Sequence, residues 1–326
     1  MSRRAVAATA LALVTMNCAL ARDTATAVAL RRGQDSAVEV ASTRITVVDD
    51  FKRRVTVRYP PKRIVSLAPG ATAMLWAAGA GSRVVATIEY SGQPASEREI
   101  PKIGNATAID MERLIAAKPD VVVVWPDGNN PAQIATIERL GIPVYEQEAV
   151  MLAGIADSVR RLGRLAGTAM IADRAADALQ AKLAFLAEKY GYPPHPSTVF
   201  LEVWDRPLYT VGGRELMSDA LRLCGARNVF GDLPQRAPAI GVEAVIARNP
   251  DIIIAAAPPG KGDSWLAAWR QFPSLKAVKT GRMMTFEDQR LAGLGPGAID
   301  AATALCREIA ALAGQKPMAS RALPGG

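Results

Sequence analysis

The sequence predicts an α/β protein with two lobes, each built on a central parallel or mixed sheet, joined by one long α-helix. Three observations predict this fold class. Strand-like and helix-like patterns alternate on both sides of the chain's midpoint, and an uninterrupted amphipathic pattern at residues 168–190 lies between them. A segment of the first half also recurs in the second. With 326 residues, the chain is long enough for two domains of ordinary size.

The first 21 residues have the pattern of a secretory signal peptide. Two arginines precede an apolar stretch at residues 5–14, and Ala19-Leu20-Ala21 forms a small-x-small cleavage site. Cys18 raises the alternative of a lipidated cysteine, although the residue before it is not small. Residues 22–43 lack periodicity and are expected to be a flexible leader. No later segment has the 18 or so continuous apolar residues of a membrane span.

The first lobe is predicted over residues 44–166. Its opening hairpin turns at Asp49-Asp50, Pro60-Pro61 then breaks the chain, and Gly79 ends the first helix. Strands are expected at 44–48, 54–59, 63–67, 83–87, 121–125 and 143–145, and helices at 73–78, 111–117 and 131–140.

The connecting helix is predicted within residues 167–192. Thr168 is a suitable N-cap, apolar residues from Met170 and Ile171 onward recur at helical spacing, and Gly191 ends the pattern. The second lobe is then expected at 193–315, before a tail at 316–326. Its strands are expected at 198–203, 252–256 and 283–286, with a strand–loop segment at 228–233, and its helices at 215–224, 242–248, 265–270 and 298–312.

The repeat joins a helix to a buried strand. Residues 109–123 (IDMERLIAAKPDVVV) recur at 240–254 (IGVEAVIARNPDIII), an offset of 131 residues that suggests two related lobes. In each copy Pro-Asp stops the helix and starts the strand, and one glutamate, Glu112 or Glu243, lies near the helix N-terminus.

Residues that could form a catalytic or metal site are scarce. His195 is the only histidine and lies between two prolines after the long helix, which is typical of an exposed linker residue. Neither a nucleophile elbow nor a phosphate-binding loop nor a zinc-ligand pattern occurs. The net charge of +8 comes from Lys and Arg scattered among 31 acids, which does not indicate nucleic-acid binding.

Aromatic residues at strand ends are more informative. Tyr90 and Trp125 follow strands of the first lobe, and Trp204 with Tyr209 follows the first strand of the second. Ligands of open α/β sheets bind beyond the carboxyl ends of the strands, so a cleft between the lobes would have aromatic walls. Such walls suit a large, flat, partly apolar ligand, with Asp288 and Arg290 as possible polar contacts.

Two cysteines, Cys224 and Cys306, remain after the signal peptide. In an oxidising compartment they suggest one disulfide, and two buried free thiols are the alternative.

Together these features resemble the helical-backbone (class III) solute-binding proteins of ABC importers. The resemblance covers residues 44–313 and rests on motifs such as Arg63-Ile-Val-Ser-Leu-Ala-Pro69, Met111-Glu-Arg-Leu and Leu223-Cys-Gly-Ala-Arg-Asn-Val-Phe230. It implies two Rossmann-like lobes, a periplasmic location, a monomer, no catalytic activity and no cofactor. The segment Trp204–Gly213 is most similar to the branch that carries cobalamin, which makes a corrinoid the expected ligand.

The resemblance also implies roles for individual residues. Tyr90 and Trp125 fall on ligand-wall positions, and Glu112 and Glu243 fall on the two acids that engage the importer's membrane subunits. Cys224 and Cys306 match a disulfide of that branch. Two wall tryptophans of the family align with Ala106 and Ala237, and Trp204 could compensate for them. A receptor for a ferric siderophore or haem is the alternative, and a secreted α/β enzyme is a more distant one.

Overall fold

The computed structural model describes residues 44–89 and 99–314. An antiparallel hairpin of β1 (Arg44–Val48) and β2 (Arg54–Arg58) begins this part of the chain. The first lobe is built on a parallel sheet in the order β4-β3-β5-β6. Its strands are β3 (Ile64–Ser66), β4 (Val84–Thr87), β5 (Val121–Val124) and β6 (Val144–Glu146). Its helices are α2 (Pro69–Ala77), η1 (Gly81–Arg83), α3 (Met111–Ala116), α4 (Pro131–Arg139) and α5 (Leu152–Ala166).

The second lobe repeats this architecture with a parallel sheet in the order β10-β9-β7-β8. Its strands are β7 (Ser197–Glu202), β8 (Ala226–Asn228), β9 (Ile252–Ala255) and β10 (Met283–Thr285). Its helices are α7 (Leu216–Leu223), α8 (Val242–Arg248), α9 (Gly262–Trp269), α10 (Lys276–Lys279), η2 (Gln289–Ala292) and α11 (Gly297–Ala313). With β8 written first, its strand order matches that of the first sheet. The predicted fold class is confirmed.

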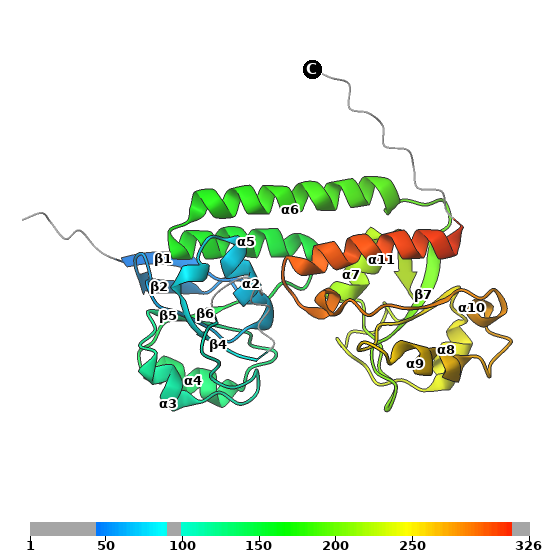
Figure 1. Cartoon of the computed structure of the whole chain (residues 1–326), viewed down its shortest axis with the longest axis horizontal. Coiled ribbons are helices and arrows are strands. Elements are labelled where there is room, and N and C mark those ends of the chain that lie inside the picture. Colours follow the sequence, from blue (N-terminus) through cyan, green and yellow to red (C-terminus); the bar gives the residue numbers. More distant parts are fainter. Residues whose placement is uncertain (1–43, 90–98, 315–326) are drawn as a thin grey trace, which may run out of the picture. The chain divides into compact units, whose positions relative to one another are not determined.

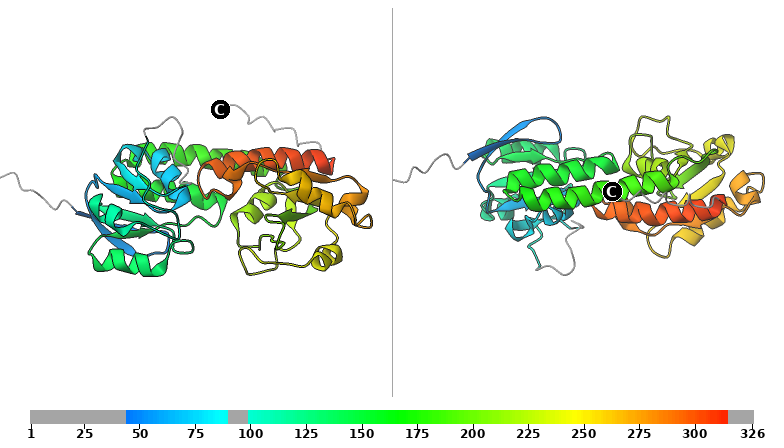
Figure 2. Two further views of the ribbon diagram at one scale, coloured as in Figure 1. Left: turned by 60° about the horizontal axis from the view of Figure 1, so that its bottom comes forward. Right: turned by 90° about the horizontal axis from the view of Figure 1, so that it is seen from above.

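The long helix α6 (Ala169–Tyr190) joins the two lobes without a break. Its 22 residues span about 33 Å at 1.5 Å per residue. Helices α5 and α11 pack along it (Figures 1 and 2). A Cβ atom on Gly163 of α5 would lie 2.1 Å from the Cβ of Ala172, so the glycine permits the close approach of α5 to α6. An ion pair of Lys182 with Asp300 joins α6 to α11.

Two details of the predicted connector are wrong. The Thr168 hydroxyl does not cap α6 but donates to the Gly163 carbonyl at 3.5 Å, because only Gly167 and Thr168 separate the two helices. Met170 and Ile171, expected on the buried face, are 76% and 53% exposed.

Helix α5 was not predicted at all. Met151, its N-cap residue, makes no side-chain cap. The Asp219 carboxylate of α7 instead accepts a 2.7 Å hydrogen bond from the Leu152 amide. The start of this first-lobe helix is therefore capped from the second lobe.

The sequence repeat is also a structural repeat. Lys118 and Asn249, at equivalent positions, both have positive φ, 45° and 44°. Asp120 accepts hydrogen bonds from the amides of Lys62 and Arg63, just before β3, at 2.7 and 3.0 Å. The equivalent Asp251 accepts from the amide and hydroxyl of Thr198 in β7, at 2.9 and 2.7 Å. Each carboxylate thus ties the start of its lobe's central strand to the neighbouring parallel strand.

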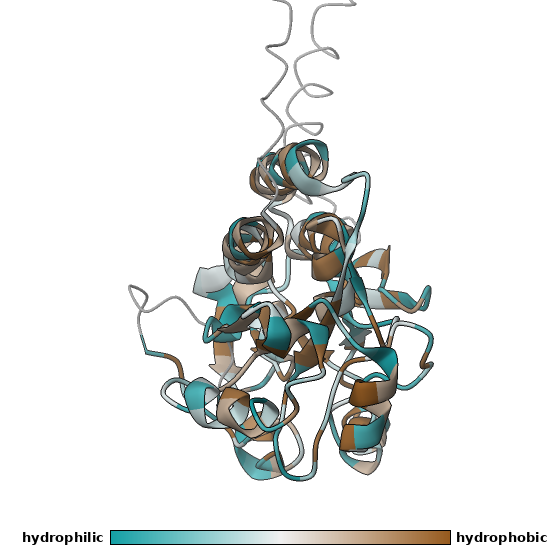
Figure 3. Ribbon diagram, turned by 90° about the vertical axis from the view of Figure 1, so that its right-hand side faces the viewer, coloured by the Kyte–Doolittle hydropathy of each residue, from teal (hydrophilic) through white to brown (hydrophobic). Residues whose placement is uncertain are grey.

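The apolar core has a shared layer and two separate ones. In β5, Val121 and Val123 belong to a cluster that continues through α2, α5, α6, α7 and α11 to Ile252 and Ile254 of β9. The opposite face of the first sheet packs against α3 and α4, and that of the second against α8 and α9, in two further clusters. Figure 3 shows apolar and polar residues alternating around the helices, as expected for helices that bury one face. Within residues 44–89 and 99–314, the structure contains no helix that is long and apolar enough to cross a membrane.

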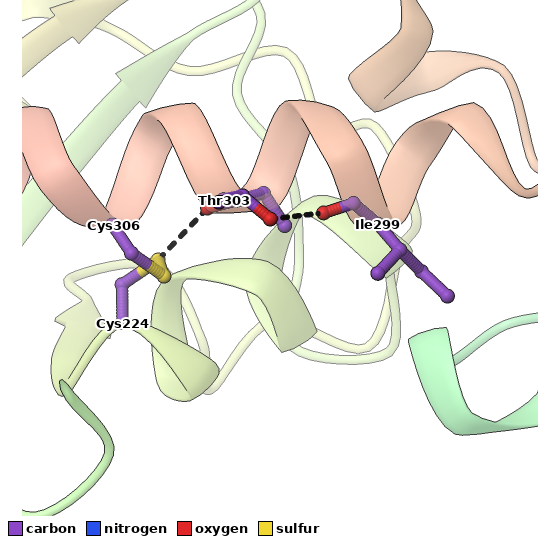
Figure 4. Close-up of a disulfide and its surroundings, with 5 residues drawn as sticks. Cys224, Ile299, Thr303 and Cys306 are labelled. Atoms are coloured by element: carbon purple, nitrogen blue, oxygen red, sulfur yellow. Dashed lines mark hydrogen bonds between the residues drawn. A yellow bond between two sulfur atoms is a disulfide. The ribbon is translucent and has the colours of Figure 1, made fainter. Parts of the chain in front are cut away.

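A disulfide between Cys224 and Cys306 joins the end of α7 to α11 (Figure 4), which confirms the predicted pairing. Both cysteines are buried. Near the bond, the Thr303 hydroxyl donates to the Ile299 carbonyl at 2.9 Å.

Removing this disulfide is expected to destabilise the protein. The bond closes a chain segment with a sequence separation of 82 residues, so its loss frees the unfolded chain. Cys224→Ala with Cys306→Ala should lower the free energy of unfolding by about 2–5 kcal/mol. Urea unfolding measures this change. Dithiothreitol should lower the midpoint of the wild type and leave that of the double variant unchanged. Equal sensitivity of both proteins to the reductant would contradict the expectation.

Glu202 should make stability depend on pH. Its side chain is 2% exposed and accepts a 2.7 Å hydrogen bond from the Trp269 indole. Burial raises the pKa of Glu202 from 4.5 to about 7, and the Trp269 hydrogen bond opposes the rise. Between these two pH values the native state keeps a proton that the unfolded chain has released. The free energy of unfolding should therefore fall as pH rises through this window, by roughly 3 kcal/mol.

Glu202→Gln keeps an acceptor for the indole and removes the charge. The variant should match the wild type near pH 4.5 and exceed its stability at pH 8, as measured by urea unfolding across the range. Parallel stability profiles of the two proteins would show that the carboxyl group does not titrate in this window.

Candidate functional site

The predicted ligand-binding residues that the structure describes lie in segments that follow the carboxyl ends of parallel strands. Trp125 directly follows β5, Trp204 is two residues beyond β7, and Asp288 is three residues beyond β10. Tyr90, predicted as a further wall residue, lies outside the described residues.

Trp125 is held by the loop that follows it. Its amide donates to the Asn129 side chain at 2.7 Å, and the buried Asn129 amide group donates to the carbonyls of Leu67 and Ala106 at 3.0 and 2.8 Å. A Cβ atom on Gly128 would lie 2.0 Å from the Trp125 ring, so the ring rests against the glycine backbone. Asn129 thus fixes the loops after β3 and β5 relative to each other.

Arg236 of the second lobe lies among three carboxylates, two of them from the first lobe. Its guanidinium pairs with Asp127 at 2.8 Å, with Glu148, and with Glu215 at 3.4 Å. Glu148 also accepts a 3.4 Å hydrogen bond from the Trp125 indole. Burial alone would lower the pKa of Arg236, but the charge of Glu215 and the hydrogen bonds that Arg236 donates to Glu148 and Asp127 raise it. Arg236 therefore links the two lobes directly beside Trp125, one of the predicted ligand-binding residues.

Glu148 is positioned by the tip of the β1–β2 hairpin. Its amide donates to Asp50 at 3.1 Å. The Asp50 carboxylate also accepts hydrogen bonds from the Ser158 hydroxyl at 2.6 Å and from the Arg161 guanidinium at 2.7 Å, both on α5. The hairpin and α5 thus orient the strand-end loop that carries Glu148.

Trp204 and Tyr209 lie together in a tight turn. The Tyr209 amide donates to the Trp204 carbonyl at 2.9 Å, and the Val203 amide donates to the Tyr209 carbonyl at 3.0 Å. The Trp204 ring packs edge-on against Trp265 at 6.4 Å between centroids, yet the residue is 50% exposed. The chain after Tyr209 runs beside the loop of Arg236, where the Gly212 amide donates to the Arg236 carbonyl at 2.9 Å.

Asp288 and Arg290 bind each other. Two hydrogen bonds, of 2.9 and 2.6 Å, join the guanidinium to the carboxylate. The side-chain hydrogen bond from Arg290 lowers the pKa of Asp288. In the described part of the chain, no hydrogen bond or ring contact connects this pair to Trp125, Trp204 or Tyr209.

Glu112 and Glu243, the predicted docking acids, are exposed in the first turns of α3 and α8. Within residues 44–89 and 99–314, neither side chain makes an ion pair or hydrogen bond, although most other acids of the lobes do.

Three further features of the described chain bear on its chemistry. His195 is exposed. No three His, Cys, Asp or Glu side chains of the described residues are grouped as a metal site requires. Two surface grooves, of about 400 and 560 Å³, lie beside α5 and α6 and contain none of the predicted site residues.

The sequence did not reveal the link of Arg236 with Asp127 and Glu148. These partners are 109 and 88 residues away along the chain, and no local motif marks them. The available signal was position alone, since Asp127 and Glu148 each follow a predicted strand by two or three residues.

Known proteins share both the sequence and the fold. Residues 64–289 match the periplasmic binding protein family. The vitamin B12-binding protein of Vibrio campbellii is 32% identical over 211 residues, which cover 65% of this chain and 76% of that relative. The crystal structure of the periplasmic vitamin B12 binding protein BtuF of Vibrio cholerae superposes with a TM-score of 0.69 at 28% identity, covering 78% of this chain and 99% of that one.

A more distant likeness concerns the fold alone. The periplasmic heme-binding protein RhuT from Roseiflexus sp. RS-1 gives a TM-score of 0.67 at 21% identity, covering 77% of this chain and 99% of that one. The family match spans well over half of the chain and includes strands of both sheets. The chain therefore belongs to the periplasmic binding protein family.

Proposed function

We propose that this protein is the substrate-binding receptor of an ABC importer, and that it captures a corrinoid, cobalamin, between its lobes. The receptor would release its cargo chemically unchanged to the membrane subunits. The proposal rests chiefly on one observation, the tryptophans Trp125 and Trp204 at the strand ends of the two lobes. The names of the relatives from Vibrio campbellii and Vibrio cholerae point to the same ligand.

The aromatic residues suit such a ligand for physical reasons. A corrin ring is large, flat and partly apolar, and indole rings offer stacking area with little loss of conformational freedom. The half-exposed Trp204 leaves ring surface free for a ligand, and Tyr209 adjoins it. In this proposal Asp288 and Arg290 contact the polar edge of the ligand, and Tyr90 contributes to the wall of the first lobe.

The proposal extends to the layout of the chain. Residues 1–21 would direct export to the periplasm, and 22–43 would form a leader. The lobes at 44–166 and 193–315 would close on the ligand about the helix at 167–192, and residues 316–326 would form a tail. The receptor would act as a monomer and would need no cofactor. Glu112 and Glu243, one on each lobe, would bind basic side chains of the two membrane subunits.

Replacing the tryptophans should weaken ligand binding. Trp125→Ala or Trp204→Ala removes one face of the stacking surface, and each should raise the Kd for cyanocobalamin by about tenfold or more in isothermal titration calorimetry. Phe185→Ala on α6, where the ring is 49% exposed, is the matched control and should leave the Kd unchanged. Parallel titrations with haemin and a ferric siderophore test the alternative cargo. Tight binding of one of these, without binding of cyanocobalamin, would reject the corrinoid and keep the receptor class.

Removing the docking acids should separate transport from binding. Glu112→Ala with Glu243→Ala should leave the Kd for cyanocobalamin unchanged, because neither residue lies at the strand ends. Uptake by the reconstituted cognate importer should fall by about tenfold or more. The control replaces two acids of α6, Asp173→Ala with Glu188→Ala, and should transport normally. Wild-type uptake by the variant that lacks Glu112 and Glu243 would remove these acids from the docking surface.

A further inference from the structure

Each docking acid has an exposed isoleucine three residues after it. Ile115 is 48% exposed and Ile246 is 37% exposed. An exposed alanine, Ala116 or Ala247, follows each one. The pattern Glu-x-x-Ile-Ala therefore occurs twice, at residues that the 131-residue repeat makes equivalent.

These isoleucines lie outside the apolar clusters of the lobes. The residue before each, Leu114 or Val245, is fully buried in the cluster beneath its helix. Neither Ile115 nor Ile246 is among the buried or partly buried residues of those clusters. Residues three apart lie on the same face of a helix, so each isoleucine is a neighbour of the free carboxylate. A single exposed isoleucine needs no explanation, but an exposed isoleucine at both equivalent positions does.

Both pairs lie on corresponding sides of their lobes. Helices α3 and α8 cover the sheet faces opposite to the shared cluster that contains α6. Figure 1 shows both helices on the side of the described chain away from α6. The protein thus presents two similar patches, each with a free negative charge beside an apolar side chain.

We propose that Ile115 and Ile246 are the apolar anchors of the surface that docks on the importer. This inference rests on the proposed function, and it specifies the partner's chemistry. Each membrane subunit would offer a basic side chain for the glutamate and an apolar hollow for the isoleucine. Two equivalent patches fit a partner with two-fold symmetry. The isoleucine would exclude water from the neighbouring ion pair, which strengthens the attraction in a lower dielectric.

The two residue types should affect different rate constants. Apolar anchors act at short range and set the dissociation rate, whereas exposed charges steer association and make it depend on salt. Ile115→Gln with Ile246→Gln should raise the dissociation rate constant by about tenfold or more and leave the salt dependence of association unchanged. Glu112→Ala with Glu243→Ala should slow association and reduce its dependence on salt.

Biolayer interferometry with the cognate importer in lipid nanodiscs, at low and high NaCl, measures both constants. Met170→Gln with Phe185→Gln is the matched control, since these residues are 76% and 49% exposed on α6, and it should bind as the wild type does. Thermal unfolding and the Kd for cyanocobalamin should be unchanged in all variants.

Three results would overturn the inference. If the isoleucine variant dissociates at the wild-type rate while the glutamate variant is impaired, docking is electrostatic and the anchors are rejected, with the proposed function intact. If the α6 control dissociates as fast as the isoleucine variant, faster dissociation follows from any added polar side chain on the surface, and the anchors are rejected. If the wild type does not bind the importer at all, the proposed function fails together with the anchors.

Discussion

One continuous apolar cluster constrains the whole molecule, because it contains core residues of both sheets. It runs from Val121 and Val123 of β5 through helices α2, α5, α6, α7 and α11 to Ile252 and Ile254 of β9. Two lobes joined only by a flexible linker could rotate freely, since the linker would bury little surface. Here a large rotation would separate packed side chains of the shared cluster. Such a separation is costly because protein interiors are packed as densely as organic crystals. The unbroken α6 and the cap that Asp219 of the second lobe provides to α5 of the first oppose the same motion. Any closure around a ligand should therefore be small.

The link at Arg236 shows how charge complements this apolar constraint. The guanidinium joins Asp127 and Glu148 of the first lobe to Glu215 of the second, beside the Trp125 indole. A partly buried charge is tolerated only when it is paired, and Arg236 finds its partners on both lobes. The network therefore favours an arrangement in which the strand ends of the two lobes stay close. Asp50 extends this order to the hairpin, since it fixes the Glu148 amide and binds α5.

The sequence was informative where local chemistry determines structure. The repeated Pro-Asp pair correctly predicted the ends of α3 and α8 and the starts of β5 and β9, because proline and a strand-binding carboxylate act on adjacent residues. Prediction from the sequence failed where a residue far along the chain determines the local structure. The N-terminus of helix α5 has no side-chain cap from its own N-cap residue, and Asp219 supplies the acceptor from 67 residues away. The Thr168 prediction failed because the short connection turns its hydroxyl toward Gly163. In the site, aromatic residues could be placed at strand ends by topology, whereas the partners of Arg236 depend on how the lobes meet. No local sequence pattern indicates how the two lobes meet.

One apolar layer of the core is shared by both lobes, and two further layers each belong to a single lobe. The two faces of each sheet therefore have different roles. The shared layer fixes the lobes relative to each other, so it also fixes the spacing of everything attached to their outer faces. Helices α3 and α8 lie over the layers that belong to one lobe each, where Leu114 and Val245 pack them against their own lobes. Their outward residues, Glu112 with Ile115 and Glu243 with Ile246, can therefore keep a nearly constant separation whether or not a ligand is bound. A receptor with such a geometry would dock on its importer as a rigid body in both states. In the proposed function, the signal that a ligand is bound would then have to come from small changes at the strand ends and at Arg236, rather than from the proposed docking acids.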